Sequence, residues 1–502
     1  MNIDSVRLLC YFTAVSPSPA STPRSPRARA NHPPSERPPL NRIAILGAGP
    51  AGYVGALRAA QLGAQVTLIE ERWLGGTCLH VGCIPTKTLV HAATLYTELS
   101  DRSFKKSGLE IEGLRFNVEK LGKRRDQTVR RLVTGVRGLL EKAGVELIEA
   151  RGRLEEPGVL AWETDDGGSG RVEADYALLC TGSEPSLPPV PGIELAWTSE
   201  RAVALPEVPE ELLIIGAGVI GLEFACIYSA LGSRVTVVEM LDRALPMEDA
   251  ELGEALAKQL KRAGIKLLTG IRVLGIEESA EGGCEVTLTE NGDEQDLRTS
   301  CDRVLVATGR KPRLNGVDAE ALGLELQRGA IVVDARLRTT LERTYAAGDC
   351  IGGHMLAHVA SYEAETAVEH MLTDHGEVHY DCVPRSVFSI PEISAVGCTE
   401  DEAAEAGIEV LVGRFPYRAS GKALAGGHSE GFVKVIADAS NNRVIGGGVF
   451  GSGASELISE IALACRHKLT LDDVADTIHS HPTLPEMIRE ASLDALGRPL
   501  HI

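Results

Sequence analysis

The stretch that decides the fold is RIAILGAGPAG, residues 42–52, a short apolar run that leads into a G-x-G-x-x-G pattern. A helix of small residues is expected next. The segment QVTLIE, residues 65–70, then supplies a second strand that ends on Glu70. Strand, glycine-rich turn, helix and strand in this order predict a βαβ unit of the dinucleotide-binding type.

The same pattern occurs a second time along the chain. LLIIGAGVIG at residues 212–221 precedes another expected helix, and RVTVVE at residues 234–239 ends on an acid. Gly216 lies 169 residues after Gly47, and Glu239 lies the same 169 residues after Glu70. One G-x-G-x-x-G is weak evidence, but two complete copies at a constant offset predict two dinucleotide sites.

Each residue of the pattern has a physical task. The first glycine permits a tight turn, the second lets the backbone approach a pyrophosphate, and the third lets helix and strand pack closely. The helix N-terminus offers unpaired N–H groups to the phosphates, and the final acid accepts from a ribose hydroxyl. These residues are Gly47, Gly49, Gly52 and Glu70 in the first copy, and Gly216, Gly218, Gly221 and Glu239 in the second.

The composition limits the classes of function. The chain has 502 residues, 44% of them hydrophobic and 24% charged, so two to four soluble domains are expected. A formal net charge of -19 argues against binding of nucleic acid or of anionic membranes, which need a basic surface. No stretch approaches the roughly 18 uncharged apolar residues that would span a bilayer.

Residues 1–40 differ from the rest because they are rich in proline, serine and arginine. Such a segment cannot build a core, so we expect a disordered tail or an over-extended start. The alternative is an organelle transit segment, because the tail is poor in acids. The prolines would spoil the amphipathic helix of such a signal, and a cytoplasmic protein is therefore favoured over one of an organelle matrix.

Eleven cysteines in so long a chain do not form a disulfide framework. Most are single; Cys226 and Cys465, for example, lie in apolar helical runs and are interpreted as small buried hydrophobes. Only Cys78 and Cys83 are closely spaced, in GGTCLHVGCIPTK at residues 75–87. This distribution indicates a reducing compartment and one special disulfide.

A bridge between Cys78 and Cys83 needs a distorted turn. Residues five apart in a regular helix have Cα atoms about 8–9 Å apart, beyond the ~7 Å that a disulfide spans. We expect Gly82 to supply the backbone freedom, and Pro85 to lie in the first turn of a following helix. Cys83 would then lie near a helix N-terminus, where the dipole favours a thiolate. The alternative, a structural zinc site, lacks a second ligand pair, so no metal is expected.

Further motifs extend the pattern. They are ALLCTG at residues 177–182, ATGR at 307–310, AGD at 347–349, LAH at 356–358 and HSHPTLPE at 479–486. With them, the chain from Arg42 onward resembles the pyridine nucleotide–disulfide oxidoreductase family. The fold implied is α/β, with two Rossmann-like dinucleotide-binding domains and a C-terminal α+β dimerisation domain.

The resemblance, together with a proline-rich linker at residues 185–191 and a change of pattern near Pro384, implies the domain boundaries. They are 1–40 for the tail, 41–190 for the FAD-binding domain, 191–311 for the NAD-binding domain, 312–380 for a central continuation of the FAD domain, and 381–502 for the interface domain. The FAD contacts implied are Gly47, Gly49, Gly52, Glu70, Lys87, Thr181, Gly182, Asp349 and Ala357. The NAD contacts implied are Gly216, Gly218, Gly221, Glu223, Glu239 and Gly309.

The resemblance also implies catalytic roles. Cys78 matches the thiol that exchanges with substrate, Cys83 the thiol against the flavin, and Lys87 with Glu223 an ion pair near the reactive flavin edge. His481 matches a general base delivered from the partner subunit of a homodimer, with Glu486 as its orienting carboxylate, and His479 is left as structural. Two positions depart from the family: His80, where asparagine is usual, and Cys180, where alanine or serine is commoner. His80 could shift the thiolate population of Cys78.

Glu239 favours NAD over NADP, because a carboxylate accepts from the 2′-hydroxyl and repels a 2′-phosphate. Within this family NAD use points to dihydrolipoamide as substrate, and so to lipoyl domains of a 2-oxo-acid dehydrogenase or glycine cleavage complex as partners. The alternatives are a glutathione- or mercuric-type reductase using NADPH, and a flavin-bearing scaffold without turnover. The vicinal cysteine pair of mercuric enzymes is missing near Ile502, and the paired cysteines argue against a scaffold.

Overall fold

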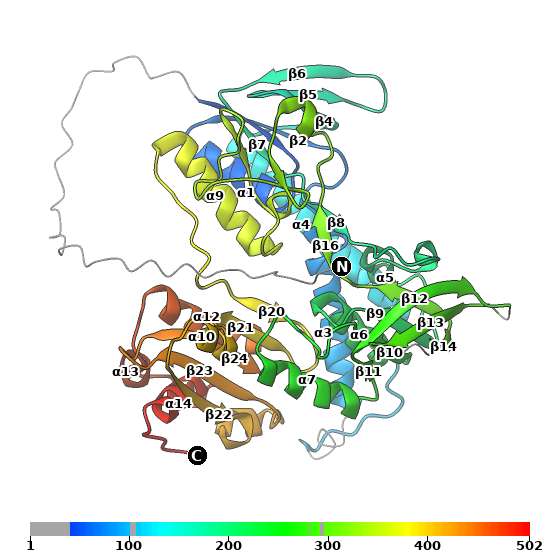
Figure 1. The fold of residues 1–502 in the computed structure, drawn as a ribbon, viewed down its shortest axis with the longest axis vertical. Helices are drawn as coiled ribbons and strands as arrows, with labels where there is room; N and C mark the ends of the chain where they lie inside the picture. Colours follow the sequence, from blue (N-terminus) through cyan, green and yellow to red (C-terminus); the bar gives the residue numbers. More distant parts are fainter. Residues whose placement is uncertain (1–40, 101–106, 281, 292–295) are drawn as a thin grey trace. The chain divides into compact units, whose positions relative to one another are not determined.

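The computed structural model describes residues 41–100, 107–280, 282–291 and 296–502 (Figure 1). The expected tail, residues 1–40, lies outside the described residues, so its interpretation stays a prediction.

The first βαβ unit forms the centre of a five-stranded parallel sheet with the order β19-β7-β1-β2-β3. Its strands are β1 (Arg42–Leu46), β2 (Gln65–Glu70), β3 (Glu146–Glu149), β7 (Tyr176–Leu179) and β19 (Thr344–Ala346). Four of the five residues of β1 are buried, as the unbroken apolar run of a covered parallel strand requires. Helices α1 (Pro50–Gln61) and α9 (Ala357–Thr373) pack together beside this sheet (Figure 1).

The second βαβ unit forms a separate parallel sheet with the order β11-β10-β9-β15. Its elements are β9 (Glu211–Ile215), α6 (Val219–Leu231), β10 (Arg234–Val238), α7 (Ala250–Arg262), β11 (Lys266–Leu268) and β15 (Arg303–Val306). The α/β architecture with two dinucleotide-binding units is therefore confirmed. Because β19 follows β15 in the sequence but pairs with β7, the chain returns to the first sheet after completing the second.

The internal repeat extends beyond the βαβ cores. Along the chain, a three-stranded antiparallel sheet is inserted between β3 and β7 in the first unit, and another is inserted between β11 and β15 in the second. The strands are β4 (Arg151–Glu156), β5 (Val159–Glu163) and β6 (Ser169–Glu173), and β12 (Ile271–Glu278), β13 (Cys284–Glu290) and β14 (Asp296–Cys301). The glycine pattern did not predict these inserts, because their sequences share no motif.

Three helices between β2 and β3 set the first unit apart from the second. They are α2 (Gly76–His80), α3 (Cys83–Ser100) and α4 (Val118–Ala143). Helix α3 packs against α6 of the second unit, and Leu89 and Val90 share a buried core with Leu222 and Phe224. The redox loop is thereby brought next to the second dinucleotide unit.

The C-terminal region forms a five-stranded antiparallel sheet with the order β20-β21-β24-β23-β22. Its elements are β20 (Arg385–Val387), β21 (Ile393–Gly397), α10 (Glu400–Glu405), β22 (Val410–Pro416), α11 (Gly421–Ala425), β23 (Phe432–Asp438), β24 (Val444–Phe450), α12 (Ala454–Arg466), α13 (Leu471–Asp476) and α14 (Glu486–Ala495). Helices α12 and α14 pack on this sheet around one apolar core. The predicted α+β character of this region is confirmed.

Short elements complete the described chain. They are β8 (Ser183–Pro185), η2 (Ile193–Leu195), α5 (Ser199–Val203), β16 (Arg310–Pro312), α8 (Ala319–Leu322), β17 (Leu326–Gln327), β18 (Ala330–Ile331), η3 (Asp349–Ile351) and η4 (Tyr417–Ala419). Strands β8 and β16 pair antiparallel, directly after β7 and β15 respectively, and so join the two units.

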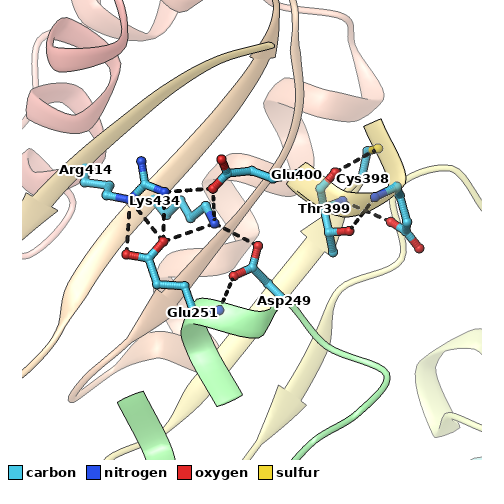
Figure 2. Close-up of polar contacts among 8 residues, drawn as sticks. Asp249, Glu251, Cys398, Thr399, Glu400, Arg414 and Lys434 are labelled. Carbon is cyan, nitrogen blue, oxygen red and sulfur yellow. Dashed lines mark hydrogen bonds and ion pairs between the residues drawn. The ribbon is translucent and has the colours of Figure 1, made fainter. Parts of the chain in front are cut away.

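A group of charges around the buried Lys434 fastens the N-terminus of α7 to the C-terminal sheet (Figure 2). Lys434 of β23 is 2% exposed, and its Nζ lies 2.8 Å from Oδ2 of Asp249, 3.2 Å from Oε2 of Glu251 and 2.5 Å from Oε1 of Glu400. Arg414 also contacts Glu251 and Glu400. Burial alone would lower the pKa of Lys434. The hydrogen bonds and charges of the carboxylates outweigh burial, so the pKa is raised overall. A buried ammonium is tolerated only with such partners.

Candidate active site

The two cysteines of the redox loop lie on either side of a helix break. Cys78 is in the middle of α2 and Cys83 is the first residue of α3, so both are half-buried at a helix junction. Their side chains hydrogen-bond to each other across this break. The turn between the two helices therefore holds the two sulfur atoms of the expected pair in contact.

Gly82 is needed for a different reason from the one the sequence suggested. Its φ is outside the left-handed region, so conformational freedom is not what it supplies. A Cβ at this position would lie 2.9 Å from the carbonyl oxygen of Thr77 and 3.1 Å from Cα of Cys78. The glycine instead permits the close approach of the two helices that carry the cysteines.

The pKa values of the two thiols shift in opposite directions. The pKa of Cys83 is lowered to about 7, mainly by the hydrogen bond from Cys78 and then by Lys87, while burial and Glu223 oppose the shift. The same hydrogen bond and burial raise the pKa of Cys78. In the dithiol the proton therefore stays on Cys78 and the negative charge lies on Cys83, at the N-terminus of α3, where the helix dipole favours an anion.

Lys87 joins the redox helix to the second dinucleotide unit. Its Nζ lies 2.8 Å from both carboxylate oxygens of Glu223, which is on α6 and 3% exposed. The carboxylate also accepts from the N–H of Phe388 at 3.0 Å, and the Lys87 ammonium lies 4.4 Å from the centroid of the Phe388 ring. The structure thus brings together Cys83, Lys87 and Glu223. The sequence did not point to Phe388, an ordinary apolar residue that directly follows β20.

The first glycine loop has the geometry of a phosphate cradle. Gly47 has a φ of 98°, and a Cβ there would lie 2.3 Å from the carbonyl oxygen of Cys180. A Cβ at Gly52 would lie 1.8 Å from the carbonyl oxygen of Gly47. Glu70 accepts from the N–H of Ala48 at 2.6 Å, which fixes the carboxylate beside the loop.

The second loop repeats this geometry. Gly216 has a φ of 107°, and a Cβ there would lie 2.5 Å from the carbonyl oxygen of Ala307. A Cβ at Gly221 would lie 2.0 Å from the carbonyl oxygen of Gly216. Glu239 accepts from the N–H of Ala217 at 2.7 Å.

The middle glycine of each loop shows where a ligand fits. A Cβ at Gly218 would meet no atom within 4 Å, and one at Gly49 would meet only Cα of Gly76, at 3.9 Å. The protein itself does not require glycine at these two positions. Open space at a helix N-terminus, with a carboxylate beside it, suits the pyrophosphate and ribose of a dinucleotide. The residues present therefore fit FAD in one loop and a nicotinamide nucleotide in the other.

Asp349 is held by residues of the β8–β16 junction. Its Oδ2 accepts from the hydroxyl of Ser183, which in turn accepts from Nε of Arg310 at 2.7 Å. The preceding residue, Gly348, donates its N–H to the buried carboxylate of Glu363 at 2.7 Å. The sequence motifs pointed to Asp349 but not to Ser183 or Glu363, which belong to none of them.

The other expected cofactor contacts lie at loop ends. Thr181 donates its hydroxyl to the carbonyl of Arg313, and Gly182 accepts from the N–H of Arg313. Gly309, with a φ of 107°, accepts from the N–H of Ser186. Ala357 is the first residue of α9.

In the C-terminal region, His481 and Glu486 contact each other as expected for a general base and its orienting carboxylate. Nδ1 of His481 lies 2.8 Å from Oε1 of Glu486, which begins α14. Burial alone would raise the pKa of Glu486. The hydrogen bonds from the N–H of Thr483 and from the His481 imidazole outweigh burial, so the pKa is lowered overall. His479 is tied to Glu460 of α12 at 2.7 Å, which suits a structural residue.

His481 is not brought to the thiols within one chain. Its side chain is 81% exposed and that of the nearby Ile478 is 96% exposed. In the described part of the chain, no hydrogen bond or ion pair joins His481 to Cys78 or Cys83.

His80 is turned toward the chain that precedes the redox loop. Its Nε2 lies 2.9 Å from the carbonyl oxygen of Leu74, and its ring stacks on Trp73 with centroids 5.7 Å apart. Tyr53 of α1, which the sequence did not single out, lies near Cys78: burial raises the pKa of Tyr53, and the interaction with Cys78 raises it further. The sequence offered no signal for Tyr53 beyond its place in the first helix.

The described residues contain neither a membrane-spanning helix nor a metal-binding cluster. No helix among them is long and apolar enough to cross a membrane. No cluster of three or more His, Cys, Asp or Glu side chains in the same ranges is arranged to hold a metal ion.

Comparison with known families agrees with this geometry. Residues 41–364 match the pyridine nucleotide-disulphide oxidoreductase model, and residues 383–492 match the dimerisation domain of the same family. The chain therefore belongs to the pyridine nucleotide-disulphide oxidoreductase family. It is an oxidoreductase that uses FAD and NAD, and it carries the family's dimerisation domain.

Similar proteins have a more specific description. A dihydrolipoamide dehydrogenase from Chaetomium thermophilum is 40% identical over 468 residues, covering 91% of this chain and 92% of that protein. A dihydrolipoyl dehydrogenase from Haloferax volcanii is 40% identical over 467 residues, covering 91% and 97%. Among solved structures, LpdA from Mycobacterium tuberculosis superposes with a TM-score of 0.82 at 32% identity, covering 90% and 99%.

Proposed function

We propose that the chain oxidises dihydrolipoyl groups with NAD⁺, the activity of a dihydrolipoyl dehydrogenase. The observation that carries the proposal is the Cys78–Cys83 thiol pair, whose charged member lies beside the Lys87–Glu223 ion pair that leads into the second dinucleotide unit. Relatives with 40% identity over nine-tenths of the chain have the same activity in their names.

The first step belongs to His481 and Glu486. Nδ1 of His481 is held by Glu486, so Nε2 is free to take a proton from one thiol of dihydrolipoamide. The resulting substrate thiolate attacks Cys78 of the oxidised pair, and Cys83 leaves as a thiolate. The second substrate thiol then attacks the substrate sulfur bonded to Cys78, which closes lipoamide and returns Cys78 as a thiol.

The next step depends on charge placement around Cys83. The Cys78 thiol and Lys87 both favour the Cys83 thiolate, so the electron-rich sulfur is held at the start of α3. When bound beside Cys83, FAD would supply the two-electron chemistry that links this thiol pair to NAD⁺. Gly47, Gly49, Gly52, Glu70, Asp349 and the N-terminus of α9 would hold FAD; Gly216, Gly218, Gly221, Glu239 and Gly309 would hold NAD.

We further propose that each site is shared between two subunits of a homodimer. The side chains of His481 and Ile478 are largely exposed within one chain, and both residues lie within residues 383–492, which match a dimerisation domain. His481 of one subunit would serve Cys78 of the other. The domain roles follow: residues 41–190 with 312–380 for FAD, 191–311 for NAD, and 381–502 for the interface.

Partners and location follow from the substrate. Dihydrolipoyl groups are carried on lipoyl domains, so we propose a 2-oxo-acid dehydrogenase or glycine cleavage complex as the assembly served. We propose a reducing compartment such as the cytoplasm, because most cysteines of the chain are single and do not form a disulfide framework.

One assay tests the proposal against its rivals. Steady-state rates are measured with dihydrolipoamide and NAD⁺, and with glutathione disulfide and NADPH. We expect turnover with the first pair at least about 100-fold faster, since Glu239 would accept from the ribose of NAD and repel the 2′-phosphate of NADP. Faster turnover with glutathione disulfide would establish a different reductase of the family, and no turnover with either pair would favour a scaffold.

A further inference from the structure

A second pair of thiols lies in the C-terminal region, far from the redox loop. Cys382 stands between α9 and β20, and Cys465 is in the last turn of α12. Their side chains hydrogen-bond to each other, as those of Cys78 and Cys83 do. Cys382 packs against the apolar core that contains Cys465, and β20 packs on α12.

The two thiols differ in access to solvent. Cys382 is half-buried, whereas Cys465 is 6% exposed. The hydrogen bond from Cys465 lowers the pKa of Cys382 against burial and the nearby charge of Asp381, and Arg466 adds a smaller lowering. The same hydrogen bond and burial raise the pKa of Cys465. An accessible thiolate with a protonated thiol in contact is the arrangement of an attacking and a resolving cysteine.

Other neighbouring cysteines lack this arrangement. Cys284 and Cys301 lie directly opposite each other on β13 and β14, but both are buried and burial raises the pKa of both. Cys226 is buried and its pKa is raised to about 12. These thiols serve as internal references for a buried, unreactive cysteine.

We propose that Cys382 and Cys465 form a second, peroxide-sensitive dithiol that closes to a disulfide. The Cys382 thiolate attacks hydrogen peroxide; an S–O bond forms, the O–O bond breaks, and hydroxide leaves. The sulfur of Cys465 then attacks the Cys382 sulfenic acid, forming the S–S bond and releasing the oxygen with the Cys465 proton as water. In sum, two thiols and one peroxide give one disulfide and two waters.

The disulfide would tie the segment before β20 to α12. Helix α12 also carries Glu460, which holds His479 two residues from His481. Oxidation would therefore fix the C-terminal end of the helix that anchors the loop of the general base. This modification is independent of the substrate assigned to Cys78 and Cys83.

The sequence gives a direct test by peptide mapping of the full chain. Trypsin would release residues 444–466, with Cys465 as the only cysteine, and residues 344–385, with Cys350 and Cys382. After mild peroxide treatment we expect these two peptides to be joined, and to separate on addition of dithiothreitol. The reference thiols Cys226 and Cys301 should stay reduced at the same dose.

Matched variants identify the partners. Cys382→Ser and Cys465→Ser should each abolish the joined species, and Cys350→Ser should keep it. Residues 386–414 carry Cys398 alone, so a bridge from Cys398 to Cys465 gives a different joined mass and would overturn the assignment. Peroxide that leaves Cys382 a thiol, or takes it to sulfinic acid without a joined species, would also overturn it. The wild-type map decides the question if a variant fails to fold.

Discussion

Glu239 accepts a hydrogen bond from the N–H of Ala217 at 2.7 Å, and Glu70 accepts one from the N–H of Ala48 at 2.6 Å, at equivalent points of the repeat. Glu239 also accepts from the N–H of Leu241 at 2.9 Å. Each carboxylate is thus fixed by the backbone of its own glycine loop, and it retains acceptor positions for a ribose.

The first prediction concerns the choice of nucleotide. Glu239→Ala removes the ribose acceptor, so NAD binding should weaken by about 1–3 kcal/mol. NADP should lose less, because the repulsion of its 2′-phosphate is removed as well. The measurement is kcat/KM with each nucleotide, and the ratio between them should fall. Equal efficiency of the wild type with both nucleotides would contradict the assignment.

The second prediction concerns the charge on Cys83. Anaerobic two-electron reduction should give a long-wavelength absorption band from the Cys83 thiolate against the flavin. The pKa of Cys83 is lowered to about 7, so the thiolate and its band should grow as pH rises through about 7 and fade below it. Cys83→Ser should abolish the band and Cys78→Ser should keep one. A full-strength band in Cys83→Ser would show that the two roles are reversed.

Lys87 provides a third prediction, measured with the same band. Lys87→Met removes the cation that lowers the pKa of Cys83 and leaves Glu223, which raises it, without its ammonium partner. The midpoint of the band should therefore move to higher pH. Lys123→Met, which removes an exposed lysine paired with Glu119 on α4, is the control and should leave the midpoint in place. An unmoved midpoint in Lys87→Met would place Lys87 away from the thiolate.

The fourth prediction separates shared from independent sites. His481→Gln should slow dihydrolipoamide oxidation by about 10² to 10⁴-fold, while NADH reduction of artificial acceptors largely survives. A heterodimer of Cys78→Ser and His481→Gln chains, isolated with two affinity tags, restores one intact site if sites are shared. Activity near half that of the wild type is expected. Purified heterodimers as inactive as the parents would mean that each chain builds its own site.

The fifth prediction concerns the buried charges around Lys434. Lys434→Met leaves Asp249, Glu251 and Glu400 without the ammonium, which should lower the free energy of unfolding by about 3–5 kcal/mol. The buried carboxylate of Asp249 loses its ion-pair partner and gains a proton more readily, so the deficit should shrink as pH falls toward 5. Lys258→Met, which removes an exposed pair on α7, should cost less than about 1 kcal/mol. Denaturant unfolding of both variants at two pH values gives the comparison.

The sequence was sufficient for features that local chemistry dictates. Both βαβ units were predicted because glycine and acid positions follow from the turn and the ligand. Cys78 and Cys83 were found because they are five residues apart. The spacing could not show that Gly82 serves close approach, since that depends on how α2 meets α3.

Features assembled by the fold were not predictable. Cys465 was interpreted as a small buried hydrophobe, and it is buried, but its partner Cys382 lies 83 residues earlier in the chain. The contacts of Lys434 with Asp249, and of Ser183 with Asp349, likewise join segments that no sequence pattern relates. Such contacts depend on the packing of whole sheets.

The exposure of His481 has a consequence for any measurement of rate. If the base of each site comes from a partner, subunit association is part of the catalytic machinery, and mass action applies to it. Specific activity toward dihydrolipoamide would then fall on dilution below the dimer dissociation constant, while activity toward artificial acceptors, which bypasses His481, would not. Comparing the two dilution curves would report the strength of the subunit contact without a separate binding experiment.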